Sequence, residues 1–184
     1  MGKLAPASFS CNPEPCVIPD VANREGSGCR GIRGKTVAAG TTCAPVCKTG
    51  FSPSETGLTC AASKLTPQTW ECRPDPCRME PIDRAFGTGC GDGRGSRIES
   101  GSNCEARCQD GYAPSVRRLS CYAGIFSPST FLCQPKPCKL PAVQNRGGSG
   151  CTGVPGESIA SGTVCQTQCI GGYTASVNQL TCTA

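Results

Sequence analysis

The chain has 184 residues, of which 18 are cysteine, 24 glycine and 16 proline, and its formal net charge is +5. A cysteine content of about one residue in ten is typical of a disulfide scaffold that folds in an oxidising compartment. The charge is spread along the chain, which gives no electrostatic support to a nucleic-acid partner, and no apolar run approaches the roughly 18 residues of a membrane span. Composition therefore predicts an extracellular or secreted protein with no nucleic-acid partner and no membrane span.

The first element along the chain is a proline-rich joint, in which two cysteines enclose four residues that include two prolines. It occurs at Cys11–Cys16 and recurs at Cys72–Cys77 and Cys133–Cys138, 61 residues apart each time. Two prolines in so short a stretch favour an extended, semi-rigid backbone. We therefore expect the joints to act as stiff connectors between folded modules.

Between the joints, the cysteines repeat with the same period of 61 residues, without insertion or deletion. Glycines and a small apolar set recur in phase as well, among them the aromatic residues Phe9, Trp70 and Phe131. A constant period of this kind is typical of an array of similar structural units. The cysteine sets inside the repeats are Cys29, Cys90 and Cys151; Cys43, Cys104 and Cys165; Cys47, Cys108 and Cys169; and Cys60, Cys121 and Cys182.

The apolar residues of each repeat are few, mostly β-branched or aromatic, and stand in short runs cut by Gly, Pro, Ser and Thr. This pattern predicts short β-strands and turns without helical periodicity. So small an apolar set cannot by itself offset the ordering entropy of a repeat. We therefore expect the disulfides to be the main stabiliser, at roughly 2–4 kcal/mol each.

The motifs of the first repeat resemble those of the sushi, or complement-control-protein, module. In chain order they are Cys16, Gly40, Cys47–Phe51, Leu58–Cys60 and Trp70–Cys72. That family is a compact, elongated β-sandwich with four cysteines, an aromatic residue near the last of them, and short linkers between modules. The resemblance covers the whole chain and implies an all-β fold class, a tandem array of three elongated sushi-like β-sandwich modules.

The expected domain organisation follows from the period and the resemblance. Residues 1–15 are the final strand of a preceding or partner-chain module plus its proline linker. Residues 16–76 are the first sushi-like repeat (repeat 1), residues 77–137 the second (repeat 2), and residues 138–184 the third (repeat 3). Repeat 3 lacks a counterpart of the final strand and final cysteine.

Six cysteines allow 15 pairings in each complete repeat, and the resemblance selects first with third and second with fourth among the family's four. Each repeat also carries two additional cysteines, in which it departs from the family. The simplest inference is a third disulfide that closes a Gly-rich loop. The pairs implied by the resemblance are Cys16–Cys60, Cys47–Cys72, Cys77–Cys121, Cys108–Cys133 and Cys138–Cys182, and the inferred additional pairs are Cys29–Cys43, Cys90–Cys104 and Cys151–Cys165.

Two cysteines, Cys11 and Cys169, are left without a partner by this scheme. The segment Met1–Cys11 is in phase with Ala62–Cys72 and Ala123–Cys133, so it matches the final strand that repeat 3 lacks. Three explanations remain open. The chain is an excerpt of a longer array, a subunit whose Met1–Cys11 strand completes repeat 3 of another copy through a Cys11–Cys169 disulfide, or a ring, which the stiff joints disfavour.

Histidine is absent, which removes the commonest general base and the commonest neutral metal ligand. The carboxylates Glu25, Glu55 and Asp75 do not pair at recurring positions. Cys43 and Cys47 have the spacing of a zinc knuckle, but the same interval arises in the sushi scaffold with an added cysteine. We therefore expect disulfides in place of a zinc site, and no enzyme activity, catalytic residue, metal or cofactor.

The first functional hypothesis is a structural repeat protein or subunit of an extracellular, disulfide-cross-linked fibre. Its partners would be copies of itself or further repeats of a longer chain. The alternative is an adhesion or receptor ectodomain of sushi-like binding modules with an extracellular protein or glycan ligand. For that alternative the most charged repeat, repeat 2, is the candidate surface, with Arg94, Arg97, Arg107, Arg117 and Arg118.

Two further sequence features carry weaker hypotheses. Ser and Thr stand beside Pro in Ser52–Ser54 and Ser127–Thr130, where O-linked sugars are a candidate modification. Simple turns are the favoured interpretation of both runs. The run Gly91–Ser96 lacks an Arg-Gly-Asp tripeptide and is predicted to be a turn.

Overall fold

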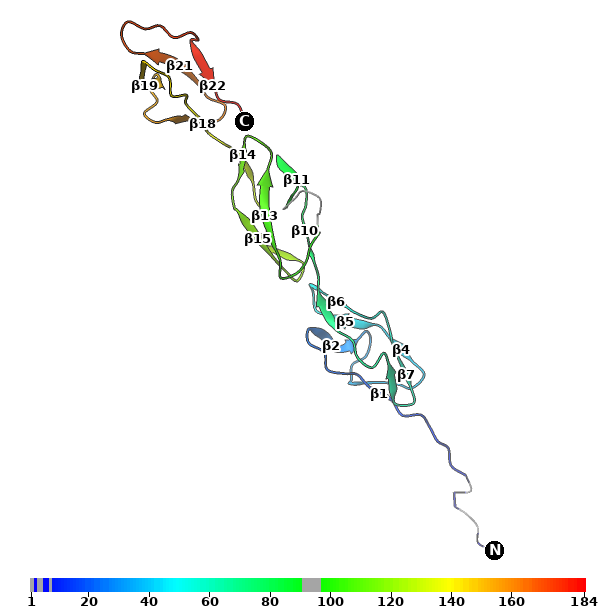
Figure 1. Cartoon of the computed structure of the whole chain (residues 1–184). Coiled ribbons are helices and arrows are strands. Elements are labelled where there is room, and N and C mark those ends of the chain that lie inside the picture. The colour runs from blue at the N-terminus through cyan, green and yellow to red at the C-terminus, as the bar shows by residue number, and fades with distance from the viewer. Residues whose placement is uncertain (1, 3–4, 7, 91–96) are drawn as a thin grey trace. The chain divides into compact units, whose positions relative to one another are not determined.

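A computed structural model describes residues 2, 5, 6, 8–90 and 97–184 of the chain. These residues form 22 β-strands and no helix (Figure 1). The structure confirms the predicted all-β, disulfide-rich class. The part of the chain that is described contains no helix long and apolar enough to cross a membrane. The predicted turn at Gly91–Ser96 lies outside the described residues.

By its packing the chain divides into two compact units. Unit 1 is Met1–Cys77 together with Tyr122–Ile125, and unit 2 is Arg78–Cys121 together with Phe126–Ala184. The strands recur at matching positions of the three repeats, as the next paragraphs show. The division into three domains stays a prediction.

Repeat 1 contains nine short strands: β1 (Cys16–Val17), β2 (Arg24–Cys29), β3 (Thr36–Val37), β4 (Thr42–Cys43), β5 (Pro45–Cys47), β6 (Phe51–Pro53), β7 (Leu58–Ala61), β8 (Lys64–Thr66) and β9 (Cys72–Pro74). They form small antiparallel sheets with the pairings β1–β3, β2–β5, β6–β9 and β4–β7–β8. Along β7 buried and exposed residues alternate, because successive side chains of a strand point to opposite faces.

Repeat 2 follows the same plan, with β10 (Cys77–Arg78), β11 (Ala85–Cys90), β12 (Arg97–Ile98), β13 (Asn103–Cys108), β14 (Tyr112–Pro114), β15 (Arg118–Tyr122), β16 (Ile125–Ser127) and β17 (Cys133–Pro135). Its pairings are β10–β12, β11–β13–β15–β16 and β14–β17. The pair β14–β17 corresponds to β6–β9 of repeat 1.

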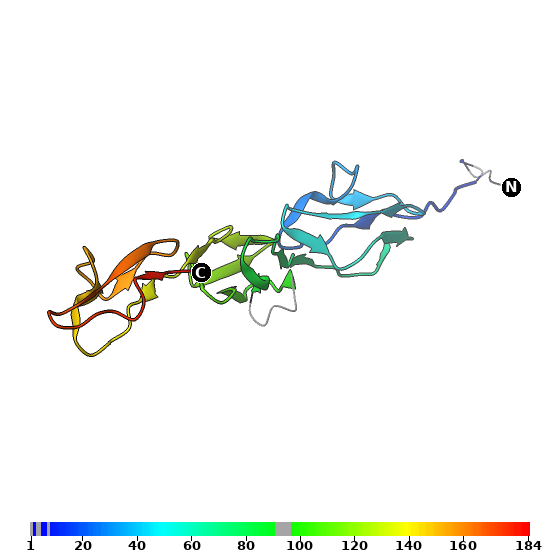
Figure 2. The ribbon, with the colours of Figure 1, turned by 90° about the horizontal axis from the view of Figure 1, so that it is seen from above.

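Repeat 3 contains β18 (Cys138–Lys139), β19 (Arg146–Cys151), β20 (Ser158–Ile159), β21 (Val164–Cys169) and β22 (Gln179–Thr181). The pairings are β18–β20 and β19–β21–β22. No strand pair within the described residues of this repeat corresponds to β6–β9 or β14–β17. Figure 2 shows the strands of the chain from a second direction.

A bulge interrupts the first long strand of every repeat at the same place. In repeat 1, Arg24 of β2 pairs with Cys47 of β5, but Cys29 pairs with Pro45, so several residues of β2 lie opposite few of β5. Equivalent register shifts occur in the pairs β11–β13 and β19–β21. Glycines at the bulge, such as Gly28 with a φ of +87°, allow a left-handed backbone that most residues avoid.

Half-cystines make up a large part of the cores. The core of repeat 1 consists of Cys16, Ile18, Cys29, Val37, Cys43, Leu58, Cys60, Leu65 and Trp70, all buried. The core of repeat 3 is smaller and contains no aromatic residue: Leu140, Cys151, Ile159, Cys165 and Cys182. With so little apolar surface available, cross-links that restrict the unfolded chain are a substantial part of the stability.

The stability of repeat 1 tests this account of the additional cysteines. Replacing Cys29→Ala together with Cys43→Ala opens a loop of sequence separation 14. We expect the free energy of unfolding of this repeat to fall by about 3 kcal/mol. The measurement is guanidinium unfolding of the monomer followed by the fluorescence of Trp70, the one tryptophan of the chain, which is buried in this core.

The matched control replaces the two unpaired cysteines, Cys11→Ala and Cys169→Ala. Because neither takes part in a bond within the chain, this double variant should unfold as the parent does. Equal stability of the Cys29/Cys43 variant and the control would contradict the role assigned to the additional disulfide.

Candidate assembly site

The structure joins the cysteines in the pairs named above and leaves two of them free. The seven bonds with described geometry are Cys16–Cys60, Cys29–Cys43, Cys47–Cys72, Cys90–Cys104, Cys108–Cys133, Cys138–Cys182 and Cys151–Cys165. Cys77 and Cys121 are disulfide-bonded as well, and since every other bonded cysteine has its partner in this series, they pair with each other. Cys11, which is exposed, and Cys169, which is half-buried, are free.

In repeats 1 and 2 the final strand lies against the segment that follows the fifth cysteine. Strand β9 pairs antiparallel with β6 in the register Phe51 with Pro74, Ser52 with Arg73 and Pro53 with Cys72. In repeat 2, β17 pairs with β14 in the corresponding register. The final strand is thus fixed by sheet pairing and by the disulfide at its first residue.

A serine extends this pairing by two further hydrogen bonds. In repeat 1 the Ser54 N–H donates to the Glu71 carbonyl over 2.8 Å, and the Glu71 N–H donates to Ser54 Oγ over 3.0 Å. Ser115 and Leu132 make the same two bonds in repeat 2, over 2.8 and 2.9 Å. Ser176 stands at the equivalent place of repeat 3.

An aromatic side chain just before the final strand fills the space beside the bulge. Trp70 is 3% exposed and Phe131 is 2% exposed. A Cβ added at Gly28 would lie 3.0 Å from Trp70 Cζ2, and one at Gly89 would lie 3.0 Å from Phe131 Cζ. The ring therefore packs directly on glycine backbone, where any larger residue would collide with it.

Repeat 3 presents the same surroundings as an open groove. A hollow of about 290 Å³ lies beside Cys169 and Gly150, which has a φ of +87° like Gly28. Its lining is largely apolar, and three of its apolar side chains are more than half exposed: Val143, Tyr173 and Val177. In repeats 1 and 2 an aromatic ring and a final strand cover the corresponding positions.

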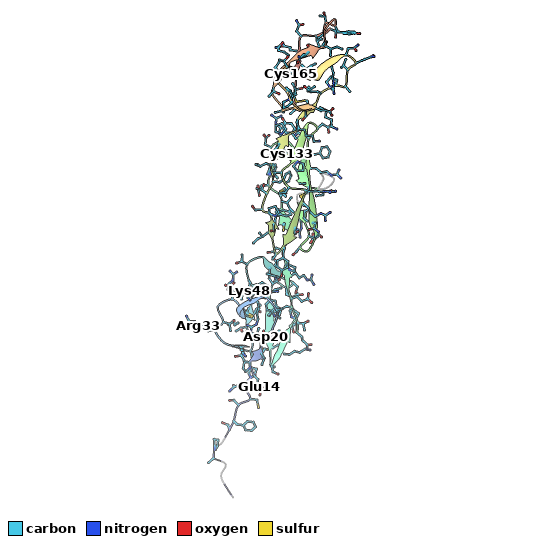
Figure 3. The ribbon with its side chains drawn as sticks, turned by 90° about the vertical axis from the view of Figure 1, so that its left-hand side faces the viewer. Glu14, Asp20, Arg33, Lys48, Cys133 and Cys165 are labelled. Atoms are coloured by element: carbon cyan, nitrogen blue, oxygen red, sulfur yellow. A yellow bond between two sulfur atoms is a disulfide. The ribbon has the colours of Figure 1, made fainter. Side chains whose placement is uncertain are left out.

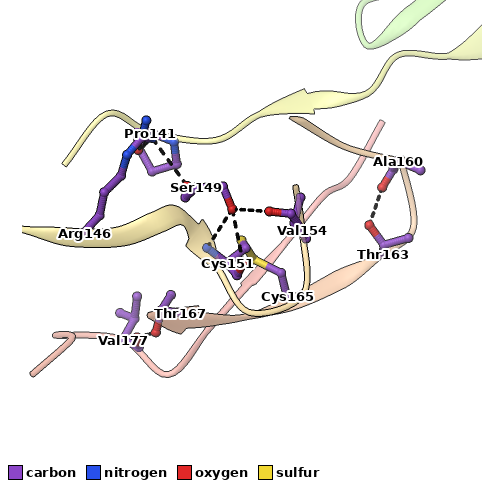
Figure 4. Close-up of a disulfide and its surroundings, with 10 residues drawn as sticks. All are labelled: Pro141, Arg146, Ser149, Cys151, Val154, Ala160, Thr163, Cys165, Thr167 and Val177. Carbon is purple, nitrogen blue, oxygen red and sulfur yellow. Dashed lines mark hydrogen bonds between the residues drawn. A yellow bond between two sulfur atoms is a disulfide. The ribbon is translucent and has the colours of Figure 1, made fainter. Parts of the chain in front are cut away.

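Arg146 forms one side of the groove and is held in place by backbone oxygens. Its Nη1 donates to the Pro141 carbonyl over 2.9 Å and to the Ser149 carbonyl over 3.4 Å (Figure 4). Nη2 makes a 3.5 Å ion pair with the exposed Glu157. The charge of Arg146 is thus directed towards these oxygens, and its aliphatic stem lies near Gly150, where an added Cβ would be 3.5 Å from Arg146 Cδ.

The Cys151–Cys165 disulfide fixes the bulge that forms the opposite side (Figure 4). Ser149 Oγ donates to the Val154 carbonyl over 2.7 Å and accepts from the Cys151 N–H over 3.4 Å. Thr167 donates a hydrogen bond to the Val177 carbonyl, which ties the segment after Tyr173 to β21. The walls of the groove are therefore cross-linked or hydrogen-bonded.

Arg24 of repeat 1 is the counterpart of Arg146, and its role differs in the charged partner. Its Nε donates to Asp20 Oδ1 over 2.8 Å. This hydrogen bond and the positive charge of Arg24 lower the pKa of the exposed Asp20 carboxyl. An arginine stem beside the aromatic ring is therefore compatible with a filled groove, as the buried Trp70 shows.

The segment before β1 carries the residues that correspond to a final strand. Phe9 is 89% exposed and Cys11 is free. Residues 8–15 belong to no strand, and in both ribbon views their trace leaves β1 without lying against another strand of unit 1 (Figures 1 and 2). Near its end the Glu14 carbonyl accepts a hydrogen bond from the Ser63 N–H over 2.8–3.0 Å, at 2.9 Å, and Figure 3 labels Glu14 on this segment.

The other candidate residues form no site. Cys43 and Cys47 belong to different disulfides, and the described residues contain no cluster of three or more potential metal ligands. In repeat 2, Arg97 and Arg117 make ion pairs with Glu99 and Glu105. The exposed arginines Arg107 and Arg118 lie on the same repeat, and Arg94 lies outside the described residues.

Sequence reasoning aligned Phe9 with Trp70 and Phe131 but missed the groove. The groove depends on the glycine bulge and on the serine that bonds the final strand. The sequence signals are Gly28, Gly89 and Gly150, and Ser54, Ser115 and Ser176, each recurring at the period of 61 residues.

The aromatic position can be tested in repeat 2 by Phe131→Ala. Removing this buried ring should lower the free energy of unfolding of the repeat by about 3–5 kcal/mol and open a groove like that of repeat 3. Amide hydrogen exchange should then accelerate in β14 and β17. The neighbouring Leu132 is 64% exposed, so Leu132→Ala is the control and should change stability by less than about 0.5 kcal/mol. Similar exchange in both variants would refute the assignment.

No protein-family model matches the chain, and no curated protein matches it. The all-β, disulfide-rich class is a property of the structure itself. The resemblance to the sushi module rests on the residue pattern alone.

Proposed function

We propose that the chain is a structural subunit of an extracellular, disulfide-cross-linked fibre, built of sushi-like repeats and joined head to tail with copies of itself. The observation that carries the proposal is the complementarity of two places in one chain. Repeat 3 has an open groove beside the free Cys169, and residues 8–15 hold an exposed aromatic residue and the free Cys11 in the phase of a final strand.

The redox chemistry of the chain supports an extracellular setting. Sixteen of the 18 cysteines are disulfide-bonded, a density that belongs to oxidising compartments. The two remaining thiols would join under the same conditions. A Cys11–Cys169 bond between copies uses different surfaces on the two partners. Such a heterologous contact gives an open filament when its rotation does not close a ring.

The same joint serves a longer array equally well. If further repeats follow in the same polypeptide, they supply the final strand to repeat 3 as β9 and β17 do in repeats 1 and 2. The adhesion or receptor alternative has no observation of its own, because two arginines of repeat 2 are engaged in ion pairs. The proposal therefore concentrates on self-assembly.

The test uses two variants that each keep one half of the joint. Cys11→Ser retains the free Cys169, and Cys169→Ser retains the free Cys11. Under oxidised glutathione we expect the parent to form a ladder of covalent multimers on non-reducing electrophoresis. An equal mixture of the two variants should stop at a dimer, because each partner has only one thiol to link.

Mass spectrometry of the dimer should identify the Cys11–Cys169 peptide pair, and electron microscopy of the oxidised parent should show filaments. A parent that stays monomeric with two free thiols, or a dimer linked through like cysteines, would sink the proposal. Monomers that bind another extracellular protein would favour the adhesion alternative.

A further inference from the structure

Building on the proposed function, we infer that the groove of repeat 3 is a receptor for Phe9 of a second copy, and that this insertion precedes and directs the Cys11–Cys169 bond. The groove comprises the open apolar surface bounded by Gly150, Arg146 and Val177. Its occupant is the segment of residues 8–15. The inference concerns recognition, which is separate from the covalent link itself.

The spacing of aromatic residue and cysteine is the first argument. Trp70 stands two residues before Cys72, Phe131 two before Cys133, and Phe9 two before Cys11. In an extended segment, residues two apart face the same side. A strand that places Cys11 at Cys169 therefore also turns Phe9 towards the groove.

The chemistry of the groove is the second argument. Glycine at position 150 leaves the backbone bare, as at Gly28 and Gly89, where a ring packs on it. Trp70 Nε1 is buried without a hydrogen-bond partner among the described residues, so this position makes no use of a polar ring atom. A phenylalanine satisfies it fully.

Exposure gives the driving force. Phe9 is 89% exposed, and Tyr173, Val143 and Val177 in the groove are 57%, 59% and 53% exposed. Insertion removes apolar surface of both partners from water, which favours association. A strand in the groove also completes the core of repeat 3, which has no aromatic residue of its own.

Backbone groups in the groove are placed to receive the strand. By the register of β6–β9 and β14–β17, Tyr173 would pair with Pro13, Thr174 with Asn12 and Ala175 with Cys11. Ser176 would bond Ser10 as Ser54 bonds Glu71.

The joint residue supplies one more bond. The Asp75 N–H donates to the Gly50 carbonyl over 2.8 Å, and the Lys136 N–H to the Gly111 carbonyl over 2.7 Å. Glu14 is the equivalent of Asp75 and Lys136, and Gly172 is the equivalent of the two glycines. Its N–H would donate to the Gly172 carbonyl of the second copy.

The covalent step then needs only a small disulfide as oxidant. The thiolate of the exposed Cys11 attacks one sulfur of oxidised glutathione and displaces a glutathione thiolate. The Cys169 thiolate next attacks the Cys11 sulfur of this mixed disulfide and displaces the second glutathione. The two protons lost by the cysteines pass to the two glutathione thiolates. Prior docking accelerates the second step, because it raises the effective concentration of Cys169.

The kinetic test compares Phe9→Ala with Phe86→Ala under oxidised glutathione. Phe86 is a second exposed phenylalanine, 51% accessible and outside the groove. We expect Phe9→Ala to slow the formation of the Cys11–Cys169 bond at least about tenfold, and Phe86→Ala to leave the rate unchanged. Phe9→Trp should link at the parent rate, since repeat 1 accommodates tryptophan.

A second measurement removes the thiols. In the background Cys11→Ser with Cys169→Ser, sedimentation should show association that rises with concentration and is lost on adding Phe9→Ala. Phe9 is exposed and lies outside the strands, so unchanged Trp70 fluorescence serves as the check on folding. Absence of association in the thiol-free background, or equal linking rates of Phe9→Ala and the parent, overturns the inference. If Cys11 and Cys169 still link at equal rates, the fibre proposal survives without it; if the parent never links them, the fibre proposal fails.

Discussion

The packing of an aromatic ring on glycine backbone, seen at Trp70 with Gly28 and at Phe131 with Gly89, ties the parts of a repeat together. The ring comes from the end of the repeat and the glycine from its first long strand. Residues that stand far apart in the chain thus meet in one small core. Because the apolar residues are few, no other group can replace this contact, and disulfides fix the strands on both sides of it. Repeat 3 has the glycine and the disulfides but no ring of its own, which is why its groove stays open.

Much of the fold could be predicted from the sequence. Short β-branched and aromatic runs between Gly and Pro predicted strands, and the structure has only strands among its described residues. The cysteine pairs came from a family resemblance and not from spacing, since the number of pairings is too large to resolve by counting. The phase of Phe9 with Trp70 indicated an equivalent position, but the groove itself could not be predicted. It depends on the φ of Gly150 and on a register shift in β19, which residue types alone do not determine.

The two free cysteines differ from the bonded ones only in where their partner would come from. Cys169 occupies the place that Cys47 and Cys108 occupy, and those two are bonded to the first residue of a final strand. Cys11 is such a first residue, and it precedes a joint of the same composition as the joints inside the chain. Specific strand docking would select this pair over Cys11–Cys11 or Cys169–Cys169, because only the mixed pair brings a ring to the groove. Shape thereby assigns a direction to a bond that thiol chemistry alone leaves undirected.

The arrangement of the disulfides also limits how far a repeat can extend under tension. Tension enters repeat 1 at Cys16 and leaves at Cys72. The bonds Cys16–Cys60 and Cys47–Cys72 overlap, so only the 13 residues between Cys47 and Cys60 can lengthen between the cross-links. Fully extended, 13 residues span about 45 Å, and the 56 residues from Cys16 to Cys72 would span about 190 Å without the bonds. In repeat 3, Cys138–Cys182 and a Cys11–Cys169 link between copies would overlap in the same way. The joint between copies would then resist extension as firmly as a repeat within the chain, which is the mechanical property that a continuous fibre requires.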